Sequence, residues 1–252
     1  MQGTRPPTIF SSIRRSSVKD RSASRQRLPD AARYLVEAIA DDVEERLGFM
    51  NFEAANILLL GDRGGVIESR LRSLFPEAQL SAPLSVDEGQ PLPSSDHDLI
   101  VSAFDLATVN DLPGALIHLR SALASGGLLI AAFPGAGSLS ALRRIMFEAD
   151  GERVSPRIHP QVDSPSAAAL LQRAGFTRQV VDSWPVNVRY SSLTTLVSDL
   201  RDHGMTSTLA SPAPPVGKAG MQRAQAAFER LSDDEGKLPE SFEILSLTGW
   251  KT

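Results

Sequence analysis

Asn56–Leu60 (NILLL) is a short apolar run that ends at Gly61, and the eight residues Leu58–Gly65 read LLLGDRGG. A continuous apolar run of this length that stops at a glycine is typical of a buried strand followed by a tight turn. Asp98–Phe104 (DLIVSAF) and Leu128–Phe133 (LLIAAF) have the same character. These three runs are the predicted central strands of a sheet.

Segments with helical spacing of apolar residues separate these strands. The predicted helices are Pro29–Leu47, Val66–Phe75, Asp111–Ser125, Ser138–Ala149, Ser164–Ala174, Ser192–His203 and Met221–Leu231, and the further strands are Gln79–Val86, Phe176–Val181, Val186–Tyr190 and Ser241–Thr248. Alternating strands and helices predict an α/β fold with a mostly parallel central sheet and helices on both faces. The long connection between the last sheet strands predicts a helical lid over about residues 184–235.

Composition limits the chemistry that this chain can perform. The 252 residues include no cysteine, which excludes disulfides, cysteine-ligated zinc, iron–sulfur clusters and a cysteine nucleophile. The net charge of −4 argues against a dedicated nucleic-acid-binding protein. No apolar run approaches the roughly 18 residues of a membrane span, so none is expected.

The N-terminal segment differs in charge from the rest of the chain. Residues 1–35 contain eight basic and two acidic residues, whereas the whole chain has more acidic than basic residues. Residues 1–28 are therefore expected to form a flexible basic arm that is free to meet a protein partner. A cytoplasmic protein is the first expectation for location; an Arg- and Ser-rich start is also compatible with a transit peptide to the mitochondrial matrix.

Several segments along the chain together resemble one known family. They are Val109–Pro113 (VNDLP), Gly126-Gly127, Gly137–Arg143 (GSLSALR), Val154–Pro156 (VSP) and Thr248–Lys251 (TGWK). In this order they resemble the class I S-adenosylmethionine (SAM) methyltransferases, more closely the methyltransferase-like assembly factors of respiratory complex I. The malonyl-carrier-protein methyltransferases of biotin synthesis are more distantly similar. The resemblance spans roughly residues 9–252 and implies a Rossmann-like fold.

The resemblance also implies a cofactor and the residues that would hold it. SAM would bind at the turn after the first strand, and the candidate residues are Gly61, Arg63, Gly65, Asp87, Ser102 and Phe104. The family turn reads Asp-x-Gly-x-Gly-x-Gly. In this chain Leu59 replaces the acid and Arg63 replaces the middle glycine. In the family, that glycine allows the cofactor to approach the backbone closely. Only 32 residues separate Gly65 from Asp98, enough for about two elements in place of four, so the fold should be shortened around its second and third strands.

Two readings of the function follow. The altered turn and the shortened segment favour a non-catalytic or weakly active relative that binds or assembles a protein partner. The alternative, which the resemblance along nearly the whole chain keeps open, is an active SAM-dependent methyltransferase, or a protein-arginine-modifying enzyme, acting on a protein or an acyl carrier. Among the histidines, His159 lies in a loop near the expected site and is a candidate general base, or simply a loop residue bonded to backbone. No metal site is expected, because the four histidines lack metal-ligand spacing.

Overall fold

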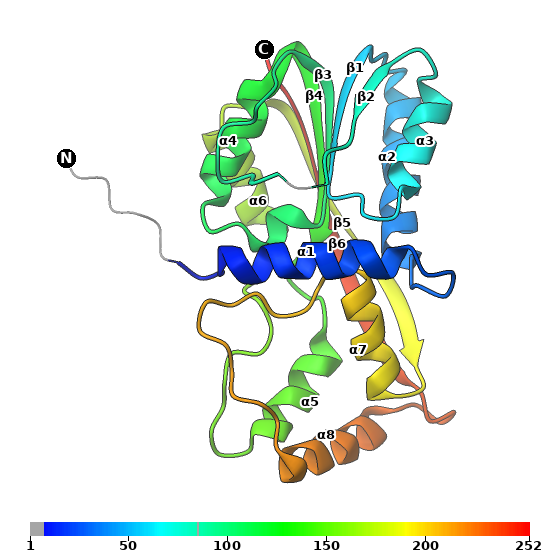
Figure 1. Cartoon of the computed structure of the whole chain (residues 1–252), viewed down its shortest axis with the longest axis vertical. Coiled ribbons are helices and arrows are strands. Elements are labelled where there is room, and N and C mark those ends of the chain that lie inside the picture. The colour runs from blue at the N-terminus through cyan, green and yellow to red at the C-terminus, as the bar shows by residue number, and fades with distance from the viewer. Residues whose placement is uncertain (1–7, 85) are drawn as a thin grey trace, which may run out of the picture.

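A computed structural model describes residues 8–84 and 86–252 and contains a six-stranded sheet in the order β2-β1-β3-β4-β6-β5 (Figure 1). The strands are β1 (Asn56–Leu60), β2 (Gln79–Ser81), β3 (His97–Ala103), β4 (Leu123–Pro134), β5 (Thr177–Tyr190) and β6 (Leu238–Trp250). Strands β2, β1, β3 and β4 run parallel to one another, and β6 is antiparallel to both β4 and β5. The predicted Rossmann-like α/β fold is confirmed.

Helices cover both faces of this sheet. They are α1 (Ser12–Gln26), α2 (Tyr34–Met50), α3 (Val66–Leu74), α4 (Leu112–Ala122), α5 (Ser140–Asp150), α6 (Ser164–Arg173), α7 (Leu193–Asp202) and α8 (Lys218–Leu231). Because side chains alternate along a strand, Ile57 and Leu59 pack in the cluster with α2 and α3, and Leu58 and Leu60 pack in the cluster with α4 and α6. This alternation explains why β1 is apolar at every position but its first.

The segment between β1 and β3 is short, as expected. It contains one helix, α3, and one strand, β2, where a complete fold of this family would have two of each. Strand β2 has only three residues and lies at the edge of the sheet beside β1. The shortening around the second and third strands is therefore confirmed.

The other edge of the sheet is longer than the sequence predicted. Phe176–Val181 and Val186–Tyr190 were expected to be separate strands, but both belong to β5, which pairs with β6 almost along its whole length. Pro185 does not break β5 because an edge strand can leave a proline on its unpaired side. The long β5–β6 pair extends beyond the rest of the sheet, and α7, α8 and α5 pack around the extension (Figure 1).

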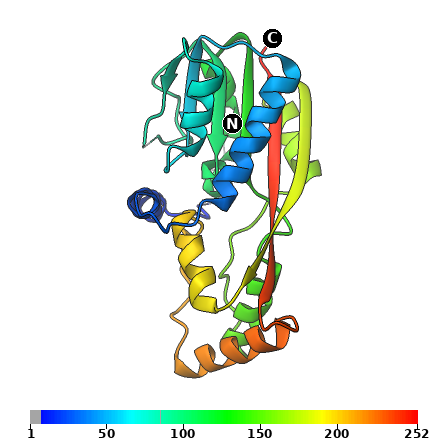
Figure 2. The same ribbon diagram turned by 90° about the vertical axis from the view of Figure 1, so that its right-hand side faces the viewer.

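The basic N-terminal segment differs from the expected flexible arm. Residues 1–7 lie outside the described residues, and Ser12–Gln26 forms helix α1, which lies across the carboxyl ends of β1 and β3 between the sheet and α7 (Figures 1 and 2). Its Val18, Ser22 and Gln26 are buried. The low hydropathy and positive charge of this segment predicted a solvated arm. The basic side chains of α1 that point toward the domain, Arg15 and Lys19, instead pair with the buried acidic residues Glu88 and Asp105.

The turn after β1 needs its first glycine for packing. Gly61 has φ +83°, and a Cβ at this position would lie 1.9 Å from the carbonyl oxygen of Ala103 in β3. Gly65 also has a positive φ, +73°, but a Cβ there meets nothing within 4 Å. The first glycine therefore lets β1 and β3 approach each other, independently of any ligand.

We predict that Gly61→Ala destabilises the protein far more than Gly65→Ala. Gly65→Ala should cost about 1–2 kcal/mol, the strain of a left-handed backbone with a side chain. Gly61→Ala adds overpacking against Ala103, about 1–3 kcal/mol further. Urea denaturation of the two variants measures the difference, and equal losses of unfolding free energy would contradict the packing role of Gly61.

Candidate functional site

The turn Gly61–Gly65 connects β1 to α3 and stands where the resemblance places a cofactor. Asp62 caps α3 from within the turn: its carboxylate accepts hydrogen bonds from the backbone N–H groups of Val66 (3.2 Å) and Glu68 (2.8 Å). Burial raises the pKa of Asp62, and the backbone hydrogen bonds partly oppose this. The N-terminus of α3, the usual anion-binding feature of such a turn, is thus occupied by the chain's own carboxylate.

A cluster of five charged side chains lies between α1 and the carboxyl ends of the strands. We call Arg15, Lys19, Arg63, Glu88 and Asp105 the charge cluster. The Lys19 ammonium lies 2.9 Å from Glu88 and 3.1 Å from Asp105, Arg15 lies 3.0 Å from Glu88, and Arg63 forms an ion pair with Asp105. Glu88 is 1% exposed and Asp105 is 7% exposed, so neither carboxylate is well solvated.

Electrostatics explains why the charge cluster holds together. Burial by itself would raise the pKa of Asp105, but the positive charges of Arg63, Lys19 and Arg15 outweigh it and keep this pKa below its usual value. A buried carboxylate without such partners would be strongly destabilising. Helix α1 therefore supplies two of the three cations that lie against the buried carboxylates Glu88 and Asp105.

Helix α1 also fills the space beside the glycine turn. The Gln26 side chain would lie 3.0 Å from a Cβ placed on Gly64. Gln26 donates to the backbone carbonyls of Ala32 and Asp202, and Ser22 donates to the same Asp202 carbonyl. The cavity that remains between α1 and the turn has a volume of about 10 Å³, close to the minimum that admits one water molecule, roughly 10–15 Å³. The residues present do not fit SAM at this position.

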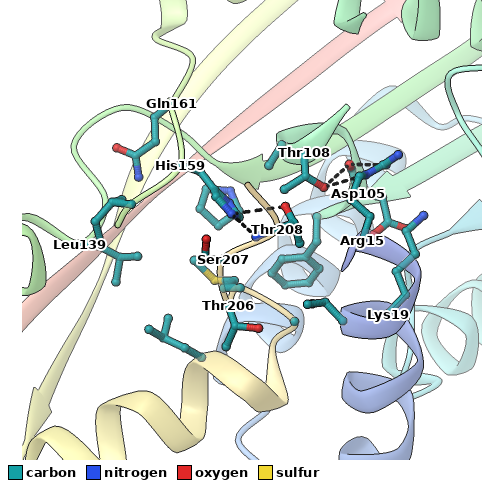
Figure 3. Close-up of a pocket in the computed structure, with 18 of the residues that line it drawn as sticks. Arg15, Lys19, Asp105, Thr108, Leu139, His159, Gln161, Thr206, Ser207 and Thr208 are labelled. Atoms are coloured by element: carbon teal, nitrogen blue, oxygen red, sulfur yellow. Dashed lines mark hydrogen bonds and ion pairs between the residues drawn. The ribbon is translucent and has the colours of Figure 1, made fainter. Parts of the chain in front are cut away.

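A larger cavity of about 210 Å³ lies on the other side of Arg63 and Phe104 (Figure 3). Its walls come from α1, the ends of β3 and β4, the loop 157–161, α7 and the loop 204–208. Apolar and polar side chains line it in about equal number, and its volume is below the roughly 300–1,000 Å³ of typical small-molecule sites. The charge cluster closes one end of it.

His159 lies at this cavity but is held as a structural group. Its Nε2 accepts a hydrogen bond from the backbone N–H of Thr208 (2.8 Å), and its ring packs edge-on against Phe10. Burial lowers the pKa of His159 to about 4. A neutral imidazole whose Nε2 lone pair is engaged by a backbone donor anchors the loop 204–208.

The other predicted site residues have diverse positions. Phe104 follows β3 with φ +64°, and its ring stacks on His203 (6.2 Å between ring centroids). The same residue lines both the small cavity beside the turn and the larger cavity. Ser102 is buried in β3. Asp87 has an exposed side chain 3.9 Å from Arg15, and its neighbour Glu88 is the acid that enters the charge cluster. Gly61, Arg63, Gly65 and Phe104 come together around the turn, and Ser102 pairs with Leu60 directly before it, whereas Asp87 lies beside Arg15.

Only part of the expected lid covers the cavity. Val197 and Leu200 of α7 and the following loop 204–208 line it. Helix α8 packs instead on α5, where Gly220 approaches the carbonyl of Ala149. The lid of 184–235 is thus divided between a cavity wall and a separate packing layer.

Sequence reasoning missed the residue that fixes the N-terminal segment. The side-chain oxygen of Asn110, in the VNDLP motif, accepts hydrogen bonds from the backbone N–H groups of Ile9 and Phe10, both at 2.8 Å, and its amide donates to the carbonyl of Phe10 at 2.9 Å. The motif was recognised, but no pattern in the sequence shows that its asparagine faces residues a hundred positions earlier. Arg15, Lys19 and Asp105 were missed for the same reason.

We predict that Lys19→Met destabilises the protein by about 3 kcal/mol. Breaking a buried ion pair costs about 3–5 kcal/mol, and the lower value is expected because Glu88 and Asp105 each retain one arginine. Arg21→Met, at an exposed position of the same helix, should change the unfolding free energy by no more than about 0.5 kcal/mol. Urea denaturation of both variants tests this, and equal effects would rule out a buried electrostatic role for Lys19.

We predict that His203 contributes to loss of stability in acid. Its ring is buried between Tyr34 (4.7 Å) and Phe104, and burial lowers its pKa to about 4. The unfolded chain binds a proton near pH 6.5, so between about pH 6.5 and 4 it binds protons that the folded protein does not, and stability falls as pH falls. In His203→Phe, the thermal midpoint should fall less between pH 7 and 5 than in the unmodified protein; parallel curves would exclude this contribution.

Within residues 8–84 and 86–252, no group of three or more acidic or histidine side chains has the arrangement of a metal site. No helix in the same described residues combines the length and the apolar character needed to cross a bilayer.

Comparisons with known proteins agree with the fold. No family model matches the chain. The arginine-hydroxylase NDUFAF5 of Rattus norvegicus, a mitochondrial protein, is 28% identical over 98% of this chain and 81% of the relative. The malonyl-[acyl-carrier protein] O-methyltransferase 1 of Coxiella burnetii is 27% identical over 95% of this chain and 89% of the relative.

A crystal structure of a putative methyltransferase from Bacillus halodurans superposes with a TM-score of 0.52 at 12% identity, covering 82% of this chain and 98% of that chain. The order of the strands, the turn after β1 and the likeness to NDUFAF5 and the malonyl-carrier methyltransferase along nearly the whole sequence agree with one another. The chain therefore has the fold of the class I methyltransferases and is similar, along nearly its whole length, to NDUFAF5 and to a malonyl-carrier methyltransferase.

Proposed function

We propose that this chain is a non-catalytic member of the class I methyltransferase superfamily that serves as a binding or assembly factor for a protein partner. The observation that carries this proposal is the position of α1: Gln26 and Ser22 occupy the space beside the glycine turn, and Arg15 and Lys19 neutralise the acidic residues nearby. SAM could reach the turn only if this helix were removed.

The attachment of α1 supports permanent closure. Arg25 forms an ion pair with buried Asp202, whose other oxygen accepts from the backbone N–H of Ala32. At the start of the helix, the backbone N–H of Ser11 donates to the carbonyl of Thr208 at 2.9 Å. Undocking α1 would break these contacts together with the charge cluster, so an open form would be rare.

The relatives suggest the kind of partner. We propose a role of the complex I assembly type, which the resemblance to NDUFAF5 implies, with a protein and not a nucleic acid as partner. We propose that the protein acts in the cytoplasm if it comes from a bacterium. The alternative location is the mitochondrial matrix, if the basic N-terminal segment is a transit peptide.

We predict that the purified protein does not bind SAM measurably in isothermal titration. The Arg63→Gly variant should behave in the same way, because removing this side chain leaves Gln26 and Ser22 of α1 in the cofactor position. The Coxiella burnetii malonyl-carrier methyltransferase is the positive control in the same buffer.

A second measurement guards against weak heat signals. A ligand at 100 times its dissociation constant adds about 2.7 kcal/mol of stability, so SAM should leave the thermal midpoint of this chain unchanged while raising that of the control enzyme. A dissociation constant in the low micromolar range would overturn the proposal and favour the alternative, a SAM-dependent enzyme acting on a protein or an acyl carrier.

A further inference from the structure

Helix α1 has a second charged face beside the one that enters the charge cluster. Residues 15, 19, 22 and 26 follow one helical stripe into the domain, and residues 14, 18, 21 and 25 follow the adjacent stripe. This second stripe faces a groove of about 800 Å³ between α1, the end of α7 and the loop after it. We call this the arginine groove; it is lined by Arg14, Val18, Asp20, Arg21, Ser24, Arg25, Arg201, Thr206 and Ser207.

The arginine groove carries uncompensated positive charge. Arg25 is neutralised by its ion pair with Asp202. Across the described residues, no carboxylate lies within ion-pair distance of Arg14, Arg21 or Arg201; the Arg14 guanidinium donates a hydrogen bond to the carbonyl of Ser207, at 3.2 Å. Asp20 is the one acidic residue on the groove lining.

This distribution contrasts with the rest of the protein. The chain has a net charge of −4, and Arg15, Lys19 and Arg63 of the charge cluster each lie within ion-pair distance of a buried carboxylate. Three unpaired guanidinium groups that converge on one concavity repel one another and raise the local positive potential. A ligand that brings negative charge into the groove removes this repulsion and gains hydrogen bonds.

We propose that the arginine groove binds an acidic, extended peptide segment of a protein partner. Guanidinium groups bind carboxylates with two parallel hydrogen bonds, which gives geometric specificity as well as attraction. The groove volume falls in the roughly 300–1,000 Å³ range of ligand sites, and Thr206 offers contact for the peptide backbone and small side chains. The proposal rests on the proposed binding role and names the surface and the chemistry of the partner.

A peptide fits these observations better than a polyanion. A protein bound to duplex DNA commonly contacts about 6–10 phosphates, and surfaces that bind anionic lipid commonly present about 4–8 basic residues. The groove has three free arginines on an otherwise acidic protein. Nucleic acid and membranes are therefore alternatives for the experiment to exclude.

The test is fluorescence anisotropy with the full chain and a fluorescein-labelled peptide of alternating glutamate and glycine. We expect saturable binding that weakens as salt screens the charges. The double variant Arg21→Glu/Arg201→Glu should bind at least about tenfold more weakly, because two of the three free cations become repulsive. The double variant Arg144→Glu/Arg173→Glu changes the net charge equally at exposed positions outside the groove and should retain the affinity.

All four substituted arginines are exposed, so both double variants are expected to fold. Circular dichroism checks this expectation. Absence of binding by the unmodified protein, an equal loss in both double variants, or tighter binding to duplex DNA or anionic vesicles at the same salt concentration would overturn the proposal. The peptide assay contains no SAM. A protein that binds both the peptide and SAM therefore retains the groove and loses only the non-catalytic assignment.

Discussion

Two carboxylates that are almost fully buried, Glu88 and Asp105, require positive charge beside them, and the rest of the site depends on meeting that requirement. The turn after β1 provides one cation, Arg63, and α1 provides Arg15 and Lys19. Without α1, Glu88 would have no cationic partner among the residues described. The electrostatics of the cleft and the docking of the N-terminal helix are therefore one property of the molecule.

This dependence separates the fold from the chemistry usually associated with it. Gly61 and the capping of α3 by Asp62 are explained by packing and by helix termination. The close approach of β1 and β3 by itself requires a glycine at the start of this turn. The turn thus supports the sheet, and side chains of α1 fill the space beside it.

The sequence predicted the sheet better than it predicted the site. Apolar runs such as Asn56–Leu60 are local signals, and the 32-residue gap after Gly65 predicted the missing elements by length alone. The docked helix could not be predicted in this way, because the charge of its residues resembles a solvated arm until their partners are known. Those partners, Glu88 and Asp105, are distant in sequence, and single-sequence patterns contain no information about pairing across such distances. The same limit hid the role of Asn110.

The attachment of α1 also has a consequence for the order of folding. Its hydrogen bonds connect residues 193 positions apart, as between Arg14 and Ser207, and 180 positions apart, as between Ser22 and Asp202. Contacts of such long sequence separation form slowly, and a ribosome must synthesise most of the chain before they can form at all. Helix α1 leaves the ribosome before the strands and helices it docks against, and it is accordingly among the last to reach its place. Until then the nascent domain exposes the acidic residues Glu88 and Asp105 and, separately, the cationic helix α1. In this state each of the two can associate prematurely with oppositely charged groups of other chains.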